Sequence, residues 1–123
     1  MHEFAVTSQL VETVLREVEK HEAEGVLEVH LVVGELTYLE PRQIRESYRL
    51  LIKDTRLAGS RLRISRSQGA VECSSCGYAG PIGVLRDPAY HLVYPTLACP
   101  KCGLSAKVTR GRECLVKRIR MVV

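Results

Sequence analysis

Two matched pairs of cysteines are the residues of this chain best suited to chemistry. They occur as Cys73-Ser-Ser-Cys76-Gly77 and Cys99-Pro-Lys-Cys102-Gly103, with 22 residues between the pairs. Two intervening residues let both sulfurs of a pair face one ion, and a glycine after each pair suits a backbone that turns with positive φ. The pattern therefore predicts one metal site with four thiolate ligands, Cys73, Cys76, Cys99 and Cys102.

Zinc is the expected ion at this site. Four protein sulfurs complete a tetrahedral coordination sphere and leave no position for water or substrate, so the site is expected to be structural. Zinc binding contributes roughly 10–16 kcal/mol in zinc-finger peptides, enough to fold a module with little core of its own. Iron is the alternative, because the two knuckles also resemble the site of rubredoxin, an electron carrier. Rubredoxins pack that site with aromatic residues, whereas this region offers only Tyr78, Tyr90 and Tyr94.

Composition and charge limit the classes of function. Apolar residues make up 46% of the chain and charged residues 26%, as in ordinary globular proteins. No apolar run approaches the roughly 20 residues that span a bilayer. Glu3 and Glu12 lie where a basic and apolar leader would be, so we expect a cytoplasmic protein. In that reducing compartment, cysteines are metal ligands or thiols rather than disulfides, and Cys114 is expected to be a small core residue.

The net charge of +4 is unevenly distributed. Residues 1–60 carry 7 Lys and Arg against 11 Asp and Glu, while residues 61–123 carry 11 against 3. A basic half with cysteine knuckles is also typical of a zinc-ribbon protein that binds nucleic acid. Against that alternative, the chain has few aromatic residues for base stacking and its first half is acidic.

The periodicity of apolar residues predicts an α+β fold. Helices are expected over residues 4–24 and from Pro41 onward, with strands at residues 26–34, 61–65 and 113–123. Residues 70–112 lose regular periodicity and are expected to be rich in loops. The apolar positions used are Phe4, Val11, Val14, Leu15 and Val18 in the first helix, Leu27, Val29, Leu31 and Val33 in the first strand, Ile44, Tyr48, Leu51 and Ile52 in the second helix, and Leu115, Ile119, Met121 and Val123 in the last strand.

These elements predict two helices packed on a small three-stranded sheet, with an inserted zinc-ribbon module that carries the two CxxC knuckles. The expected domains are an α+β domain made of residues 1–69 plus 112–123, and a zinc-binding domain of residues 70–111. The last strand is expected to return to the sheet of the first domain.

The chain resembles the HypA/HybF family of nickel metallochaperones. The resemblance is carried by Met1-His2-Glu3, by "VGELTYLEP" at residues 33–41 and by the paired knuckles, and it covers essentially the whole chain. It implies a carrier, not an enzyme, that binds Ni²⁺ at the extreme N-terminus and holds structural Zn²⁺ in the inserted module. It implies delivery of nickel to the large-subunit precursor of [NiFe]-hydrogenase with a HypB-type GTPase, and in some relatives service to urease maturation proteins. No nucleic-acid or membrane partner is expected, and the oligomeric state is expected to be a monomer or weak homodimer.

The chemistry of the first residues agrees with that resemblance. The Met1 amine, the amide nitrogen and imidazole of His2 and the Glu3 carboxylate can surround one ion with the nitrogen-rich set that Ni²⁺ favours. An α-amine ordinarily has a pKa of about 7.7–8.0 and an imidazole about 6.5, so nickel affinity is expected to fall between about pH 8 and pH 6. His91 is a further candidate nickel ligand, and a surface histidine fits that position equally well.

Other positions have both ordinary and functional interpretations. His21 and His30 are expected to be ordinary polar residues, the first solvated and the second on the polar face of a strand. Residues 33–41 can be either a docking surface for the GTPase or a simple connection between strand and helix. The same two interpretations apply to the exposed arginines of the second helix, Arg42, Arg45 and Arg49.

Overall fold

The computed structural model describes residues 2–87, 89 and 92–123, which form two compact units. The helical unit contains the residues up to Val33 together with Tyr38–Arg66 and Cys114–Val123. The cysteine unit contains Gly34–Thr37 and Ser67–Glu113. Residues 34–37 thus pack with the cysteine region, an arrangement that the sequence alone does not indicate.

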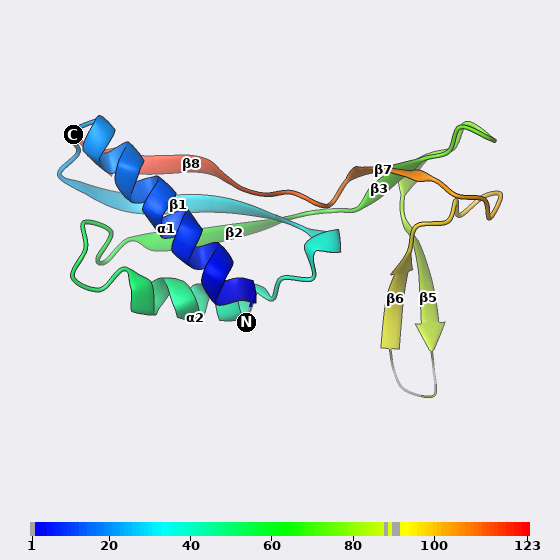
Figure 1. The fold of residues 1–123 in the computed structure, drawn as a ribbon, viewed down its shortest axis with the longest axis horizontal. Helices are drawn as coiled ribbons and strands as arrows, with labels where there is room; N and C mark the ends of the chain where they lie inside the picture. Colours follow the sequence, from blue (N-terminus) through cyan, green and yellow to red (C-terminus); the bar gives the residue numbers. More distant parts are fainter. Residues whose placement is uncertain (1, 88, 90–91) are drawn as a thin grey trace. The chain divides into compact units, whose positions relative to one another are not determined.

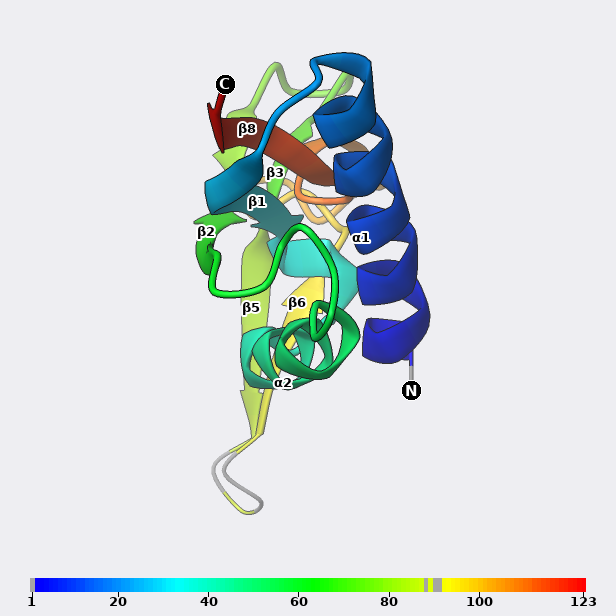
Figure 2. The same ribbon diagram turned by 90° about the vertical axis from the view of Figure 1, so that its left-hand side faces the viewer.

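The helical unit is built from two α-helices and a three-stranded sheet, which confirms the predicted fold (Figure 1). The sheet has the strand order β2-β1-β8, and the last strand of the chain does return to it. Figure 2 shows both helices on one side of this sheet, so no helix of this unit covers its other face, the open face. The elements are α1 (His2–Lys20), β1 (Gly25–Gly34), α2 (Pro41–Leu51), β2 (Arg61–Ser67) and β8 (Cys114–Val122).

The apolar stripe of α1 packs against the sheet and α2, but its bounds differ from the sequence prediction. The helix begins at His2 and ends at Lys20. The predicted helix, residues 4–24, starts two residues too late and ends four residues too late. Phe4 is 51% exposed and lies outside the core, contrary to the sequence prediction. The helical residues fully inside the core are Thr7, Val14 and Val18 in α1 and Ile44 in α2.

Two β-bulges change which residues of the sheet face the core. The antiparallel ladder between β1 and β8 pairs Val26 with Met121 and Glu28 with Arg120, so Leu27 is an extra residue. Leu27 is therefore exposed and Val26 is buried, the reverse of the predicted alternation.

The second irregularity makes Lys117 the extra residue of β8. Leu115 is exposed as a result, and Val116 joins the predicted Ile119 and Met121 against the core. Val123 is exposed because it lies beyond the end of β8 at Val122. A single period of two cannot describe a strand whose alternation is interrupted.

Helix α2 begins as its sequence predicts. Pro41 lies in the first turn, where no backbone N–H is needed, and Glu40 is the N-cap residue. One carboxylate oxygen of Glu40 accepts a hydrogen bond from the Arg42 amide at 3.2 Å. This cap satisfies one of the free donors at the start of the helix.

The cysteine unit contains more strand than the expected loops. Its three-stranded sheet has the order β4-β3-β7, and a separate antiparallel hairpin joins β5 and β6. The elements are the short 3-10 helix η1 (Glu35–Thr37) and the strands β3 (Ala70–Glu72), β4 (Ala79–Pro81), β5 (Gly83–Asp87), β6 (Leu92–Thr96) and β7 (Lys107–Arg110). Strands this short carry too few residues for a detectable alternation, which explains the missing signal.

Three glycines meet where the chain enters and leaves the cysteine unit. The Gly34 amide donates to the Glu113 carbonyl at 2.7 Å, and the Gly69 amide donates to the Glu35 carboxylate at 2.7 Å. A β-carbon on Gly34 would lie 2.2 Å from the carbonyl oxygen of Gly111. Gly111 has a φ of 110° and packs against Gly69. Glycine at position 34 is therefore required by space, and at position 111 by space and by backbone conformation.

Candidate metal centre

Two knuckles of the same backbone geometry hold the four cysteines of the pairs. In each knuckle the first cysteine donates its amide to a carbonyl five residues on, Tyr78 or Leu104, at 2.8 and 2.7 Å. The glycine four residues after that cysteine donates back to the cysteine's carbonyl at 2.9 Å in both cases. Gly77 and Gly103 have φ values of 78° and 79° with open space around them. Glycine is thus favoured at both positions by conformation alone, as the sequence predicts.

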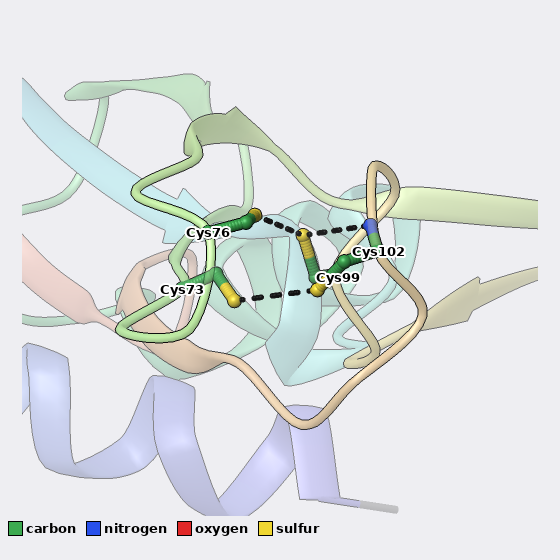
Figure 3. A group of neighbouring side chains, drawn as sticks. All are labelled: Cys73, Cys76, Cys99 and Cys102. Atoms are coloured by element: carbon green, nitrogen blue, oxygen red, sulfur yellow. Dashed lines mark hydrogen bonds between the residues drawn. The ribbon is translucent and has the colours of Figure 1, made fainter.

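The four sulfurs converge as a metal site requires (Figure 3). All four ligand atoms lie within 4.8 Å of one another. Sγ of Cys73 is 3.6 Å from that of Cys102, and Sγ of Cys76 is 3.6 Å from that of Cys99. A tetrahedron with metal–sulfur bonds of about 2.3 Å has edges of about 3.8 Å. The donor set therefore fits a tetrahedral ion of the size of zinc, and iron bound by four thiolates would fit it as well.

Burial differs within each pair. Cys73 and Cys99, the first cysteines of the knuckles, are 1% and 2% exposed, whereas Cys76 and Cys102 lie at the surface. The centre is therefore anchored from inside the unit and reaches solvent through one sulfur of each knuckle.

The acid–base properties of the sulfurs favour a cation among them. Burial opposes ionisation of Cys99, but the amides of Cys102 and Lys101 donate to its sulfur and bring its pKa down to about 6. At Cys102 the Leu104 amide favours the thiolate, yet burial and the neighbouring sulfurs, Cys73 foremost, raise the pKa to about 11. Without a cation, each thiolate disfavours the next, because like charges at this distance repel. A divalent ion removes that conflict and lets all four ionise.

The structure describes part of the predicted nickel site at the N-terminus. Met1 lies outside the described residues. The His2 side chain is exposed in the first turn of α1, and Glu3 is partly buried beside it. Glu3 accepts a hydrogen bond from the Glu40 amide at 3.0 Å, and this amide, followed by Glu3's own, lowers the pKa of the Glu3 carboxyl to about 2.

The contact between Glu3 and Glu40 was not expected from the sequence. It joins the first turn of α1 to the residue that caps α2, and both belong to the helical unit. The two residues are 37 positions apart, so no local pattern links them. Glu3 belongs to Met1-His2-Glu3 and Glu40 to residues 33–41, two of the segments that carry the family resemblance. This shared membership is the only sequence signal that could have suggested the contact.

Of the remaining candidate residues, those that the structure describes are not part of the four-cysteine cluster. His91 lies outside the described residues. His21 is exposed, as expected, with Nδ1 3.0 Å from the Glu17 carbonyl oxygen. His30 lies on the open face of the sheet as predicted, but it is 6% exposed rather than solvated, with Nε2 2.6 Å from the Ser65 hydroxyl. Cys114 was expected in the core and is instead exposed, at the rim of a groove beside α1.

Fold and cysteine cluster together define a small two-unit protein with a four-cysteine metal site. Comparison with known families is more specific. The family model "Hydrogenase/urease nickel incorporation, metallochaperone, hypA" matches residues 1–121, and the chain belongs to this HypA family. No helix in the described part of the chain is long and apolar enough to cross a membrane.

Curated relatives match the chain over nearly its full length. "Hydrogenase maturation factor HypA" of Methanopyrus kandleri is 34% identical over 134 residues, covering 100% of this chain and 94% of the relative. The protein of the same name from Methanothermobacter thermautotrophicus is 38% identical over 122 residues, covering 98% and 97%.

Solved structures support the fold. The solution structure of the Ni metallochaperone HypA from Helicobacter pylori aligns with a TM-score of 0.65 at 18% identity, covering 98% of this chain and 97% of that one. A second structure, titled "Solution structure of HypA protein", aligns with a TM-score of 0.68 at 20% identity, covering 99% and 97%.

Proposed function

We propose that this chain carries Ni²⁺ at its N-terminus and passes it on to a [NiFe]-hydrogenase precursor with a GTPase partner of the HypB type. Family membership supports a role in nickel incorporation for hydrogenase or urease. In the proposed nickel site the ligands are Met1, His2 and Glu3, with His91 as a further candidate. In this proposal the protein binds and releases its cargo without catalysing a reaction, acts in the cytoplasm and is a monomer or weak homodimer.

The environment of Glu3 is the observation that carries the nickel assignment. The Glu3 carboxylate lies next to His2 in the first turn of α1 and is ionised at physiological pH, as a glutamate ordinarily is, so it is available as an oxygen ligand. The hydrogen bond from the Glu40 amide engages one carboxylate oxygen and orients the group. A donor that is already oriented and charged binds a cation without losing side-chain freedom.

The position of His2 in its helix supports the same assignment. The first N–H groups of an α-helix have no acceptor within the helix, so the His2 amide nitrogen is not committed to the ladder of α1. An amide, an imidazole and an amine from adjacent residues form fused chelate rings that suit Ni²⁺. The imidazole is exposed, which suits a site that must load and unload.

The four-cysteine centre has a different role in this proposal. Its closed donor set leaves no open position for exchange with a partner, so the centre is structural and zinc is its ion. The proposed division is a nickel-binding α+β domain of residues 1–69 plus 112–123 and a zinc-binding domain of residues 70–111. Metal analysis and the visible absorption spectrum test the identity of the ion. One zinc per chain and a colourless solution would support zinc, whereas strong visible absorption would indicate iron.

Nickel titration of three matched proteins tests the cargo site. Isothermal calorimetry would compare the zinc-loaded native chain, His2→Ala, and the control His21→Ala, which removes an exposed histidine from the other end of α1. We expect the native chain and His21→Ala to bind one Ni²⁺ with equal affinity. His2→Ala should lose at least about a hundredfold, because it removes the imidazole and breaks the chelate ring that joins the imidazole to the amide nitrogen.

A chain extended by a few residues before Met1 tests the contribution of the α-amine separately. It should also lose tight nickel binding while keeping its zinc. Equal nickel uptake by all four proteins would contradict the N-terminal site. Loss of zinc in His2→Ala would indicate a folding defect, which circular dichroism of the helices would detect.

A further inference from the structure

The last strand of the helical unit has a free edge. β8 pairs with β1 on one side, and no other strand of the described residues pairs with its other side. Figure 1 shows β8 at the outer side of the sheet, away from β2. About half of the backbone N–H and C=O groups of an edge strand point away from its only partner. This nine-residue edge is therefore able to accept another strand.

The open face of the sheet next to this edge is positively charged. Arg118 lies opposite His30 in the ladder, and Arg120 lies opposite Glu28. Both arginines are exposed, and neither has an ion-pair partner within the described residues. Arg61 and Arg63 of β2, on the other side of β1, are exposed as well.

Cations of both neighbouring strands act on His30. Burial is the first cause of its lowered pKa, followed by the charges of Arg63, Lys117 and Arg118. Glu28 acts in the opposite direction and is the single acidic residue among these causes. Residues from β2 and β8 therefore act together on the space above β1.

The helix side of the same edge is apolar. A groove of about 480 Å³ lies between α1 and β8, within the helical unit. Most of its lining is apolar, and only Gln9 and Thr13 are polar. The other lining residues are Val6, Leu10, Leu31, Cys114, Leu115 and Val116. Leu115 is 48% exposed, so the groove is not closed by the chain's own side chains.

We propose that the free edge of β8 is a docking strand for an extended segment of a partner protein in which apolar and acidic side chains alternate. Side chains of a strand point alternately to the two faces of a sheet. An added strand would direct one row toward the groove beside α1 and the other toward Arg118 and Arg120. This inference does not depend on the proposed nickel function.

Charge argues against one other occupant of this edge, and residue composition argues against a second. A second copy of the chain would bring β8 against β8 or β2, and both strands present arginines, which repel one another across a ladder. Single-stranded nucleic acid needs aromatic side chains for base stacking, and β1, β2 and β8 contain no Phe, Tyr or Trp.

A synthetic peptide of nine residues that alternates Val and Glu, the length of β8, tests the proposal. Fluorescence anisotropy would measure its binding to the native zinc-loaded protein, to Arg118→Glu/Arg120→Glu, and to the control Arg42→Glu/Arg49→Glu. The control changes the net charge by the same amount as the β8 variant, at two exposed positions of α2. We expect the β8 variant to weaken binding at least about tenfold and the control less than about twofold.

Two further measurements identify the mode of binding. Amide hydrogen exchange should slow at residues 114–122 when the peptide binds, and a peptide of the same composition with all Glu before all Val should bind more weakly. If the reversed charges unfold the sheet, Arg118→Gln/Arg120→Gln tests the same contacts. A peptide alternating Val and Lys should bind the folded β8 variant with restored affinity.

Four results would overturn the proposal. They are an absence of peptide binding, equal losses in both double variants, protection only at residues outside β8, and tighter binding of a short oligothymidylate that depends on the same arginines.

Discussion

The substitution Gly34→Ala tests how the base of the cysteine unit is held together. An alanine β-carbon at this position would lie 2.2 Å from the Gly111 carbonyl oxygen and 2.4 Å from its carbon. These are backbone atoms and cannot rotate away as a flexible side chain would. The segment must therefore move, and the hydrogen bond from the Gly34 amide to the Glu113 carbonyl, now 2.7 Å long, would be stretched or broken.

The size of the effect follows from these two contributions. Overpacking a closely packed site typically costs about 1–3 kcal/mol. Loss of one backbone hydrogen bond adds about 0.5–1.5 kcal/mol. We expect Gly34→Ala to lower the free energy of unfolding by about 2–4 kcal/mol.

Gly59→Ala is the matched control, because Gly59 has a φ of 80° and a β-carbon added there would meet no atom within 4 Å. Its cost should be only the conformational penalty, about 1 kcal/mol. Urea unfolding followed by circular dichroism would measure both variants, and hydrogen exchange would locate the loss of Gly34→Ala at β3 and β7. If Gly34→Ala is no less stable than Gly59→Ala, the close approach of the two backbones is not a constraint on the fold.

Three further predictions concern the metal centre, the sheet and the second helix. Cys99→Ser should abolish stoichiometric zinc binding by metal analysis, because it removes a buried ligand; a fully zinc-loaded variant would contradict the centre. His30→Gln should reduce the loss of stability on acidification: the lowered pKa of His30 means that the unfolded chain protonates first, so stability declines below about pH 6.5. Urea unfolding would measure the free energy of unfolding at about pH 7.5 and 5.5, and the decrease between them should be smaller in His30→Gln than in the native protein. An equal decrease in both proteins would refute this prediction. Glu40→Ala removes the N-cap side chain of α2 and should cost about 1 kcal/mol in thermal unfolding, whereas an unchanged midpoint would argue against the cap.

The metal centre could be predicted from the sequence because its information is local. Each knuckle is a turn of a few residues with two cysteines and a glycine, and the two turns have matching hydrogen bonds. The start of α2 was predictable for the same reason, since Pro41 acts on the backbone next to it. Patterns of this kind require no knowledge of distant parts of the chain.

The departures from prediction arise from long-range contacts. The bulges at Leu27 and Lys117 are set by the pairing of two strands nearly a hundred residues apart, so alternation in either strand alone could not reveal them. His30 is buried because β2 and β8 flank it, although its neighbours in sequence are those of an ordinary half-exposed strand. The role of Gly34 likewise depends on Gly111, which follows it by most of the chain.

The unequal burial of the two sulfurs in each knuckle sets the direction from which the metal centre can be attacked. An oxidant or a competing thiol arriving from solvent meets Cys76 and Cys102 first, while Cys73 and Cys99 remain shielded. Oxidation should therefore begin at Cys76 and Cys102. A two-electron oxidant would join these two sulfurs in a disulfide, and reduction of that bond by a thiol would restore all four ligands.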